Sequence, residues 1–127
     1  MERAFREKRL GNSQVILKNV FIRSAVYEGM QKSGLPTDTL IQHHVSMVRG
    51  GVGMTTVSYG AVSPDGRTFH EQMYIHRESL NRMALLAKEV HRAGGKVSMQ
   101  LTHSGYFTKN KKKTFCKMVG EYFRKNE

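Results

Sequence analysis

The chain has 127 residues, of which 39% are apolar, with one cysteine and no tryptophan. This length suits one domain, and a single cysteine cannot form an internal disulfide, so nothing in the composition indicates an oxidising compartment. No run approaches the roughly 20 apolar residues of a membrane span, and the charged first nine residues lack the apolar core of a signal peptide. We therefore expect a cytoplasmic protein without a membrane partner.

Basic residues outnumber acidic ones by 21 to 10, and the resulting net charge of +11 is unevenly distributed. Residues 109–127 hold seven basic and two acidic side chains, a net +5, which is nearly half of the excess. A basic tail can contact phosphates or an anionic surface, although a solvated tail is the simpler interpretation. Because aromatic residues do not alternate with these lysines, we expect no nucleic-acid partner.

Three segments have the composition of strands, namely residues 20–22, 52–59 and 96–101. A further short extended segment is expected at residues 14–17, with a turn at Lys18–Asn19. The stretch 52–59 is rich in β-branched residues and carries no charge. This composition predicts a strand that is covered on both faces.

Two helices are expected between these strands. The first starts after Thr37 or Asp38, either of which is a suitable N-cap, and stops at Gly50–Gly51. The second spans residues 79–92 and stops at Gly94–Gly95. The side chains expected to face the core are Leu40, Ile41, His44, Val45 and Val48 in the first helix, and Leu80, Met83, Ala84, Ala87 and Val90 in the second.

Alternating strands and helices predict an α/β fold in which parallel strands are joined by right-handed crossovers. Parallel sheets of this kind bind ligands beyond the carboxyl ends of their strands. The segments that follow the three expected strands are therefore candidates, namely 24–27, 59–61 and 100–103. Their small residues allow a flat ligand to approach the backbone, and Gln100 offers both an amide donor and a carbonyl acceptor.

Five stretches resemble the old yellow enzyme family, the FMN-dependent NAD(P)H:flavin oxidoreductases and ene-reductases, in the family's order. They are residues 18–30, 34–37, 50–54, 61–66 and 90–105. Each motif is short, and the specificity comes from five matches in register over about a hundred residues. The resemblance implies a TIM (β/α)8 barrel of which this chain holds the first two to three βα units, a truncated barrel. Residues 1–108 would be the N-terminal part of the FMN-binding barrel, and residues 109–127 a lysine-rich tail without a family counterpart.

The resemblance also implies a cofactor site. Its six residues would be Ser24, Ala25, Val26, Tyr27, Tyr59 and Gln100. The first three correspond to the segment along the isoalloxazine ring, and Gln100 to the glutamine that binds the pyrimidine edge. Tyr27 stands where the family usually has Thr or Cys, and Tyr59 where it often has Ala or Gly. The resemblance assigns no catalytic residue within the chain. Because the histidines are adjacent or lie in different elements without a Cys or carboxylate pattern, we also expect no metal site.

Several parts of the family's machinery have no counterpart here, because they follow the third strand. They are the His/Asn or His/His pair for the substrate carbonyl, the proton-donating Tyr and the phosphate-binding loops. In the family, NAD(P)H reduces FMN, which then reduces an activated alkene or a quinone-like acceptor. Three hypotheses follow: an N-terminal piece of such an oxidoreductase that needs a complementing C-terminal barrel fragment, a non-enzymatic interaction protein acting through its basic tail, or a small flavoprotein assembled as an oligomer.

Overall fold

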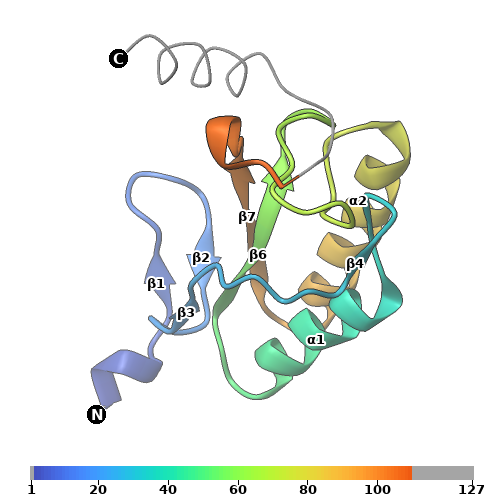
Figure 1. Ribbon diagram of the computed structural model, residues 1–127. Helices are drawn as coiled ribbons and strands as arrows, with labels where there is room; N and C mark the ends of the chain where they lie inside the picture. Colours follow the sequence, from blue (N-terminus) through green and yellow to red (C-terminus); the bar gives the residue numbers. More distant parts are fainter. Residues whose placement is uncertain (1, 110–127) are drawn as a thin grey trace, which may run out of the picture.

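A computed structural model describes residues 2–109 (Figure 1). Its central sheet has three parallel strands in the order β3-β6-β7. The strands are β3 (Ile22–Arg23), β6 (Met54–Ala61) and β7 (Lys96–Thr102). The connecting helices are α1 (Asp38–Arg49) and α2 (Arg77–Arg92), and both lie on the same face of the sheet (Figure 1). The alternation of strands and helices thus forms the parallel α/β arrangement that the sequence predicts.

Four shorter strands form two antiparallel pairs outside this sheet. They are β1 (Lys8–Arg9) with β2 (Ile16–Leu17), and β4 (Gln31–Lys32) with β5 (Leu35–Pro36). Short 3-10 helices lie at Glu2–Phe5 and Gly105–Phe107. The extended segment expected at residues 14–17 contains β2. Its partner β1 was not expected, because the two charged residues Lys8 and Arg9 show no strand pattern. Gly34 turns the second pair with φ of +81°, a conformation that glycine adopts without strain.

Helix α1 has the boundaries and the buried face that the sequence predicts. The Oγ1 of Thr37 accepts a hydrogen bond from the backbone N–H of Leu40, so Thr37 is the N-cap. At the other end, Gly50 caps the helix and Gly51 has φ of +109°. The buried residues of α1 are Leu40, Ile41, His44, Val45 and Val48, as expected.

Helix α2 begins two residues earlier than expected, because Ser79 caps it from inside the first turn. Its Oγ accepts from the N–H of His76 at 3.0 Å and donates to the carbonyl of His76 at 2.9 Å. The expected inward face is partly wrong: Leu80 is 51% exposed and Ala84 is exposed, while Leu86 is buried. The apolar stripe of α2 is wider than the surface available to cover it, so one flank of the stripe stays in contact with solvent.

The core lies between the helices and the sheet. It contains Leu40, Ile41, Val45, Val48, Val57, Met73, Leu86 and Val90. The opposite face of the sheet is open, so the expectation that residues 52–59 are covered on both faces is wrong. Met54, Thr56 and Tyr59 are half-buried, whereas the helix-facing Thr55 and Val57 are buried. The physical reason is that three strands cannot close around their inner face as a barrel does.

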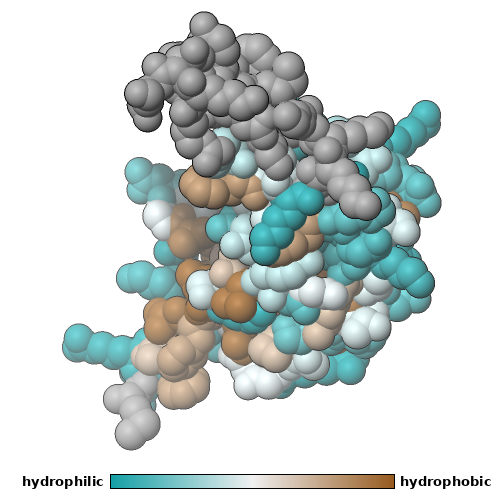
Figure 2. All heavy atoms as spheres, in the orientation of Figure 1, coloured by the Kyte–Doolittle hydropathy of each residue, from teal (hydrophilic) through white to brown (hydrophobic). Residues whose placement is uncertain are grey.

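Apolar side chains also reach the surface around the first strands. Figure 2 shows them as brown atoms at the lower left, over the N-terminal pair of strands and β3. The residues are 37% to 63% exposed, and they are Phe5, Leu10, Val15, Ile16, Val20, Phe21 and Ile22. Within residues 2–109, no helix has the length and apolar character that crossing a membrane requires.

Candidate functional site

Parallel pairing brings the carboxyl ends of the three central strands to one edge of the sheet (Figure 1). Met54 of β6 is paired with Ile22 of β3 on one side and with Lys96 of β7 on the other. The three strands therefore start at the same level and run in the same direction. The segments expected to meet, 24–27, 59–61 and 100–103, follow or end these neighbouring strands, and this edge is the candidate site.

The segment after β3 presents unused backbone groups to this edge. Ser24 and Val26 are exposed, with Val26 at 59%. Within residues 2–109, the backbone of Ala25, Val26 and Tyr27 makes no hydrogen bond to the rest of the chain. Backbone N–H and C=O groups require a partner, either water or a ligand. This stretch can therefore supply donors and acceptors to a flat molecule lying against it.

The ring of Tyr27 belongs to an aromatic group at the same edge. It stacks on Phe69 with ring centroids 4.8 Å apart and meets Tyr59 edge-on at 5.5 Å. Burial raises the pKa of the Tyr27 phenol, and the charges of Glu71 and Glu28 raise it further. The phenol is therefore protonated at neutral pH and can donate a hydrogen bond.

Tyr59 has an unusual backbone conformation for a residue near the end of a strand. Its φ is +52°, and the pairing of β6 with β7 is shifted by a β-bulge between Val57 and Gly60. A Cβ on Gly60 would lie 2.8 Å from the Sδ of Met99, so a larger residue at position 60 would displace the methionine side chain. The bulge changes the direction in which the Tyr59 side chain leaves the strand.

Gln100 lies opposite this bulge, between the paired positions Met99 and Leu101 of β7. Its side chain is exposed and makes no hydrogen bond with other residues of the described range 2–109. The amide thus has both its donor and its acceptor available. A heterocycle with donor and acceptor edges matches that combination.

A buried carboxylate lies directly behind the segment 24–27. The side chain of Glu28 is 1% exposed, and its Oε1 accepts a hydrogen bond from Nη1 of Arg23 at 3.0 Å. Its Oε2 accepts from the Oγ of Ser58 at 2.6 Å. The same Arg23 Nη1 donates to the carbonyl of Thr56 at 3.2 Å. Glu28 therefore joins the end of β3 to the end of β6 through paired and hydrogen-bonded charges.

His44 of α1 packs against the same group. Its Nδ1 lies 2.8 Å from the Oγ1 of Thr55, and its Nε2 lies 3.5 Å from the Oε1 of Glu28. Burial lowers the pKa of His44 to about 4, although the carboxylate of Glu28 acts in the opposite direction. The imidazole is consequently neutral at physiological pH.

Sequence reasoning predicted candidate residues at the strand ends but not the buried hydrogen bonds behind them. The described structure brings the candidate strand ends to one edge, and Tyr27 to Tyr59 in direct ring contact. The residues missed are Arg23, Gln31 and Gln72, and for Glu28 and Ser58, which lie at the strand ends, what was missed is the bond between them. The one available signal was a charged pair within an otherwise apolar and small-residue stretch, Arg23 with Glu28, because such charges are rarely buried unless paired.

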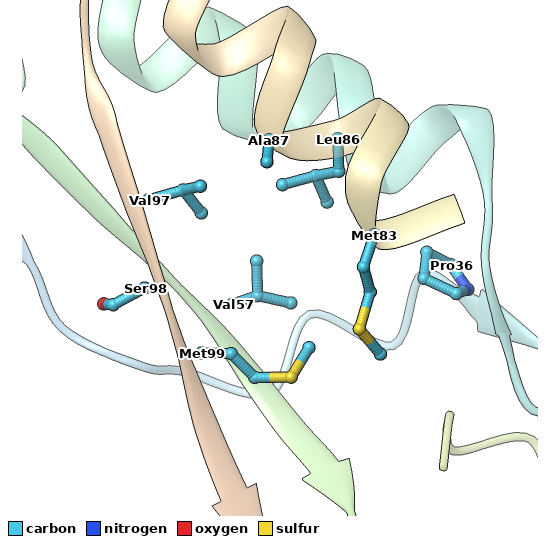
Figure 3. Close-up of a pocket in the computed structure, with 8 residues that line it drawn as sticks. All are labelled: Pro36, Val57, Met83, Leu86, Ala87, Val97, Ser98 and Met99. Carbon is cyan, nitrogen blue, oxygen red and sulfur yellow. The ribbon is translucent and has the colours of Figure 1, made fainter. Parts of the chain in front are cut away.

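A cavity of about 180 Å³ lies elsewhere, between α2 and the sheet (Figure 3). Its lining consists of Pro36, Val57, Met83, Leu86, Ala87, Val97, Ser98 and Met99. Leu86 and Ala87 point from α2 toward the strands (Figure 3), and the Oγ of Ser98 already pairs with the Oγ1 of Thr56 at 2.8 Å. An apolar space without free polar groups does not orient a polar ligand. This cavity is therefore a packing gap beside the open flank of α2.

Comparison with known proteins identifies the family. A model of the NADH:flavin oxidoreductase / NADH oxidase family matches residues 9–122, so the match continues past Lys109 into the lysine-rich segment. The 4,4'-dithiodibutanoate disulfide reductase of Rhodococcus erythropolis is 35% identical over 115 residues, covering 88% of this chain and 28% of that protein. An NADPH dehydrogenase of Bacillus subtilis (strain 168) is 33% identical over 92 residues, covering 70% of this chain and 27% of that protein.

Solved structures show the same fold. The old yellow enzyme from a Pichia species superposes with a TM-score of 0.77 at 18% identity, covering 95% of this chain and 30% of that one. Morphinone reductase in complex with tetrahydroNAD gives 0.69 at 21% identity, covering 83% of this chain and 28% of that one. The chain thus spans under a third of the length of these relatives and has the fold of the first part of their TIM barrel. The family match implies FMN as cofactor and NAD(P)H as reductant. The chain belongs to the NADH:flavin oxidoreductase / NADH oxidase family, the old yellow enzyme family that its sequence motifs indicated.

Proposed function

We propose that this chain supplies the N-terminal strands of an FMN-dependent NAD(P)H oxidoreductase, and that the edge formed by β3, β6 and β7 holds part of the isoalloxazine ring. The observation that supports this most strongly is the set of unused polar groups there. The backbone of Ala25 to Tyr27 and the amide of Gln100 have no hydrogen-bond partner within residues 2–109. These groups match the donor and acceptor pattern of a flavin edge.

The residues present fit the flavin ring but not the whole cofactor. Ser24, Ala25 and Val26 would lie along the ring, Gln100 would bind its pyrimidine edge, and the rings of Tyr27 and Tyr59 would flank it. When bound, FMN accepts hydride from NAD(P)H and passes it to an acceptor, while the protein supplies orientation and electrostatics. The phosphate group and the substrate need residues from the later barrel strands.

The described sheet leaves room for those strands. Within residues 2–109, β3 and β7 each pair with β6 alone, so the outer side of each of these strands is an unpaired lateral edge of the sheet. We propose that the remaining βα units complete the barrel at these edges, with an activated alkene or a quinone-like compound as the electron acceptor. The cytoplasmic location stays a prediction that the single cysteine supports.

A chimera tests this function. Residues 1–122, up to the end of the family match, are joined to the part of the Rhodococcus erythropolis relative that follows the corresponding position, and bound FMN is measured after purification. We expect the chimera to carry flavin and to oxidise NAD(P)H, and the 127-residue chain alone to be colourless. Gln100→Leu in the chimera should weaken FMN binding at least tenfold.

The matched control is Gln42→Leu, which changes an exposed glutamine on α1, outside the three segments that form the candidate site. It should leave FMN binding unchanged. A chimera that folds, as judged by circular dichroism, but binds no flavin would refute the proposal. Equal flavin affinity in the Gln100→Leu and Gln42→Leu chimeras would remove Gln100 from the site.

A further inference from the structure

The end of β6 is held in a conformation that its own sequence disfavours. Tyr59 has φ of +52°, in the left-handed region, and stands between Ser58 and Gly60 within the bulge. A non-glycine residue there is strained, so it persists only where its surroundings enforce it. Contacts from neighbouring side chains must therefore stabilise this conformation of Tyr59.

Two buried glutamines bind the backbone at this point. Gln72, with no exposed surface, donates from Nε2 to the carbonyl of Tyr59 at 2.9 Å and to the Oγ1 of Thr102 at 3.2 Å. Gln31, which is 5% exposed, donates from Nε2 to the carbonyl of Ser58 at 3.1 Å. Two successive carbonyls of the bulge are thus satisfied by side chains.

The other end of each amide binds a different segment. The Oε1 of Gln72 accepts from the N–H of Thr68 at 2.7 Å, and the Oε1 of Gln31 accepts from the N–H of Met73 at 2.9 Å. Each glutamine therefore bridges the end of β6 and the loop that follows it. A primary amide carries its donor and its acceptor on separate atoms, and each glutamine uses both, the Nε2 toward β6 and the Oε1 toward the loop.

We propose that Gln31 and Gln72 are positioning residues that hold Tyr59 in its left-handed conformation and thereby set its ring edge-on to Tyr27 at the flavin-facing edge. The flavin part of this inference rests on the proposed function, while the conformational part does not. The ring centroids of Tyr27 and Tyr59 are 5.5 Å apart. Release of the two carbonyls would let residue 59 return to an ordinary strand conformation, which moves its side chain.

The first test uses the 127-residue chain. Gln72→Met and Gln31→Met keep the length of the side chain and remove the amide, and Gln42→Met is the matched control on an exposed face of α1. Nuclear magnetic resonance measures the coupling between the amide and Hα protons of Tyr59 and the ring-to-ring Overhauser effect between Tyr27 and Tyr59. We expect both signals to change in the two test variants and to persist in the control.

A milder variant covers the case in which Gln72→Met does not fold. Thr102→Val removes the second acceptor of the Gln72 amide but leaves its bond to Tyr59, so it should weaken the Overhauser effect without abolishing it. If the coupling and the Overhauser effect of Tyr59 persist in all folded variants of Gln31, Gln72 and Thr102, the proposal is wrong.

The second test uses the chimera with bound FMN. Gln72→Met should raise the dissociation constant of FMN at least tenfold, about 1.4 kcal/mol. Val48→Ala, which opens a cavity in the core near α1, should lower the thermal midpoint without changing FMN affinity. Equal effects of the two variants on FMN affinity would show that Gln72 acts only through stability. A chimera without flavin would refute the proposed function and leave the Tyr59 measurement decisive for this inference.

Discussion

The carboxylate of Glu28 accepts a hydrogen bond of 2.6 Å from the hydroxyl of Ser58, thirty residues further along the chain. The bond joins the segment after β3 to the end of β6, and both partners are buried. A second oxygen of the same carboxylate pairs with Arg23. Two of the three strand ends that form the candidate site are therefore fixed by one side chain.

The first prediction concerns this carboxylate. Glu28→Gln removes the negative charge while it keeps the shape of the side chain, and it leaves the guanidinium of Arg23 without its ionic partner. We expect the free energy of unfolding to fall by about 1–3 kcal/mol in urea titrations. Glu78→Gln on the exposed side of α2 is the control and should change it by less than about 0.5 kcal/mol. Equal losses in the two variants would contradict the role of the buried pair.

The second prediction concerns acid stability. His44 has a pKa of about 4 in the folded chain, below its ordinary value of 6.5. The unfolded state therefore binds a proton that the folded state does not as pH falls from 6.5 towards 4. Stability is fully present above pH 6.5 and decreases across that window, by at most about 3 kcal/mol.

Unfolding curves at a series of pH values measure this loss. His44→Gln should have a shallower decline between pH 6.5 and 4 than the natural chain. His70→Gln is the control, because the side chain of His70 is 84% exposed and its removal should leave the slope unchanged. The interpretation fails if the slopes of the natural chain and the His44 variant coincide.

The third prediction concerns the N-cap of α1. Thr37→Ala removes an acceptor for the N–H of Leu40 and a donor to the carbonyl of Met30. We expect a loss of about 1–2 kcal/mol in the free energy of unfolding. Thr39 lies two residues further along, and its side chain is exposed. Thr39→Ala should therefore be neutral or slightly stabilising, because alanine favours helix. A neutral Thr37 variant would show that the helix start is held by other contacts.

The fourth prediction concerns the two sides of α2. Leu86 is 2% exposed and Leu80 is 51% exposed. Leu86→Gln should therefore lower the free energy of unfolding by about 3 kcal/mol, since it places an amide in the core and leaves a poorly packed site. Leu80→Gln should lie within about 0.5 kcal/mol of the natural chain. Thermal unfolding of the two variants measures this difference. Equal midpoints would show that the buried face of α2 is wrongly assigned.

The fold was predictable wherever a local pattern determined the element. Both helices, their glycine stops and the two long strands follow from apolar spacing and capping residues, as Thr37 and Gly50 illustrate. The inward face of α2 was not predictable in full, because Leu80 and Leu86 are equally apolar and only the tertiary contacts distinguish them. Periodicity gives the width of an apolar stripe but not which part of it is covered.

The candidate site divides in the same way. Exposed positions such as Gln100 follow from strand ends and family motifs. The buried bonds from Glu28 to Ser58, from Gln31 to Met73 and from Gln72 to Tyr59 could not be predicted, since they join residues that are 13 to 42 positions apart in sequence. Likewise, nothing in the residue type of Tyr59 indicates a positive φ, which depends on carbonyl partners contributed by two other segments.

The strand order β3-β6-β7 gives the sheet of residues 2–109 two different edges. An association in which β7 of one copy pairs in parallel with β3 of the next uses one edge of each type, so it leaves the same two edges free at the ends of the assembly. Such growth has no natural stopping point unless the rotation closes into a ring, in contrast to a two-fold dimer. If the isolated chain associated through these edges, higher concentration would lengthen the assembly, and supplying the later strands of a barrel would end that growth by occupying both edges at once.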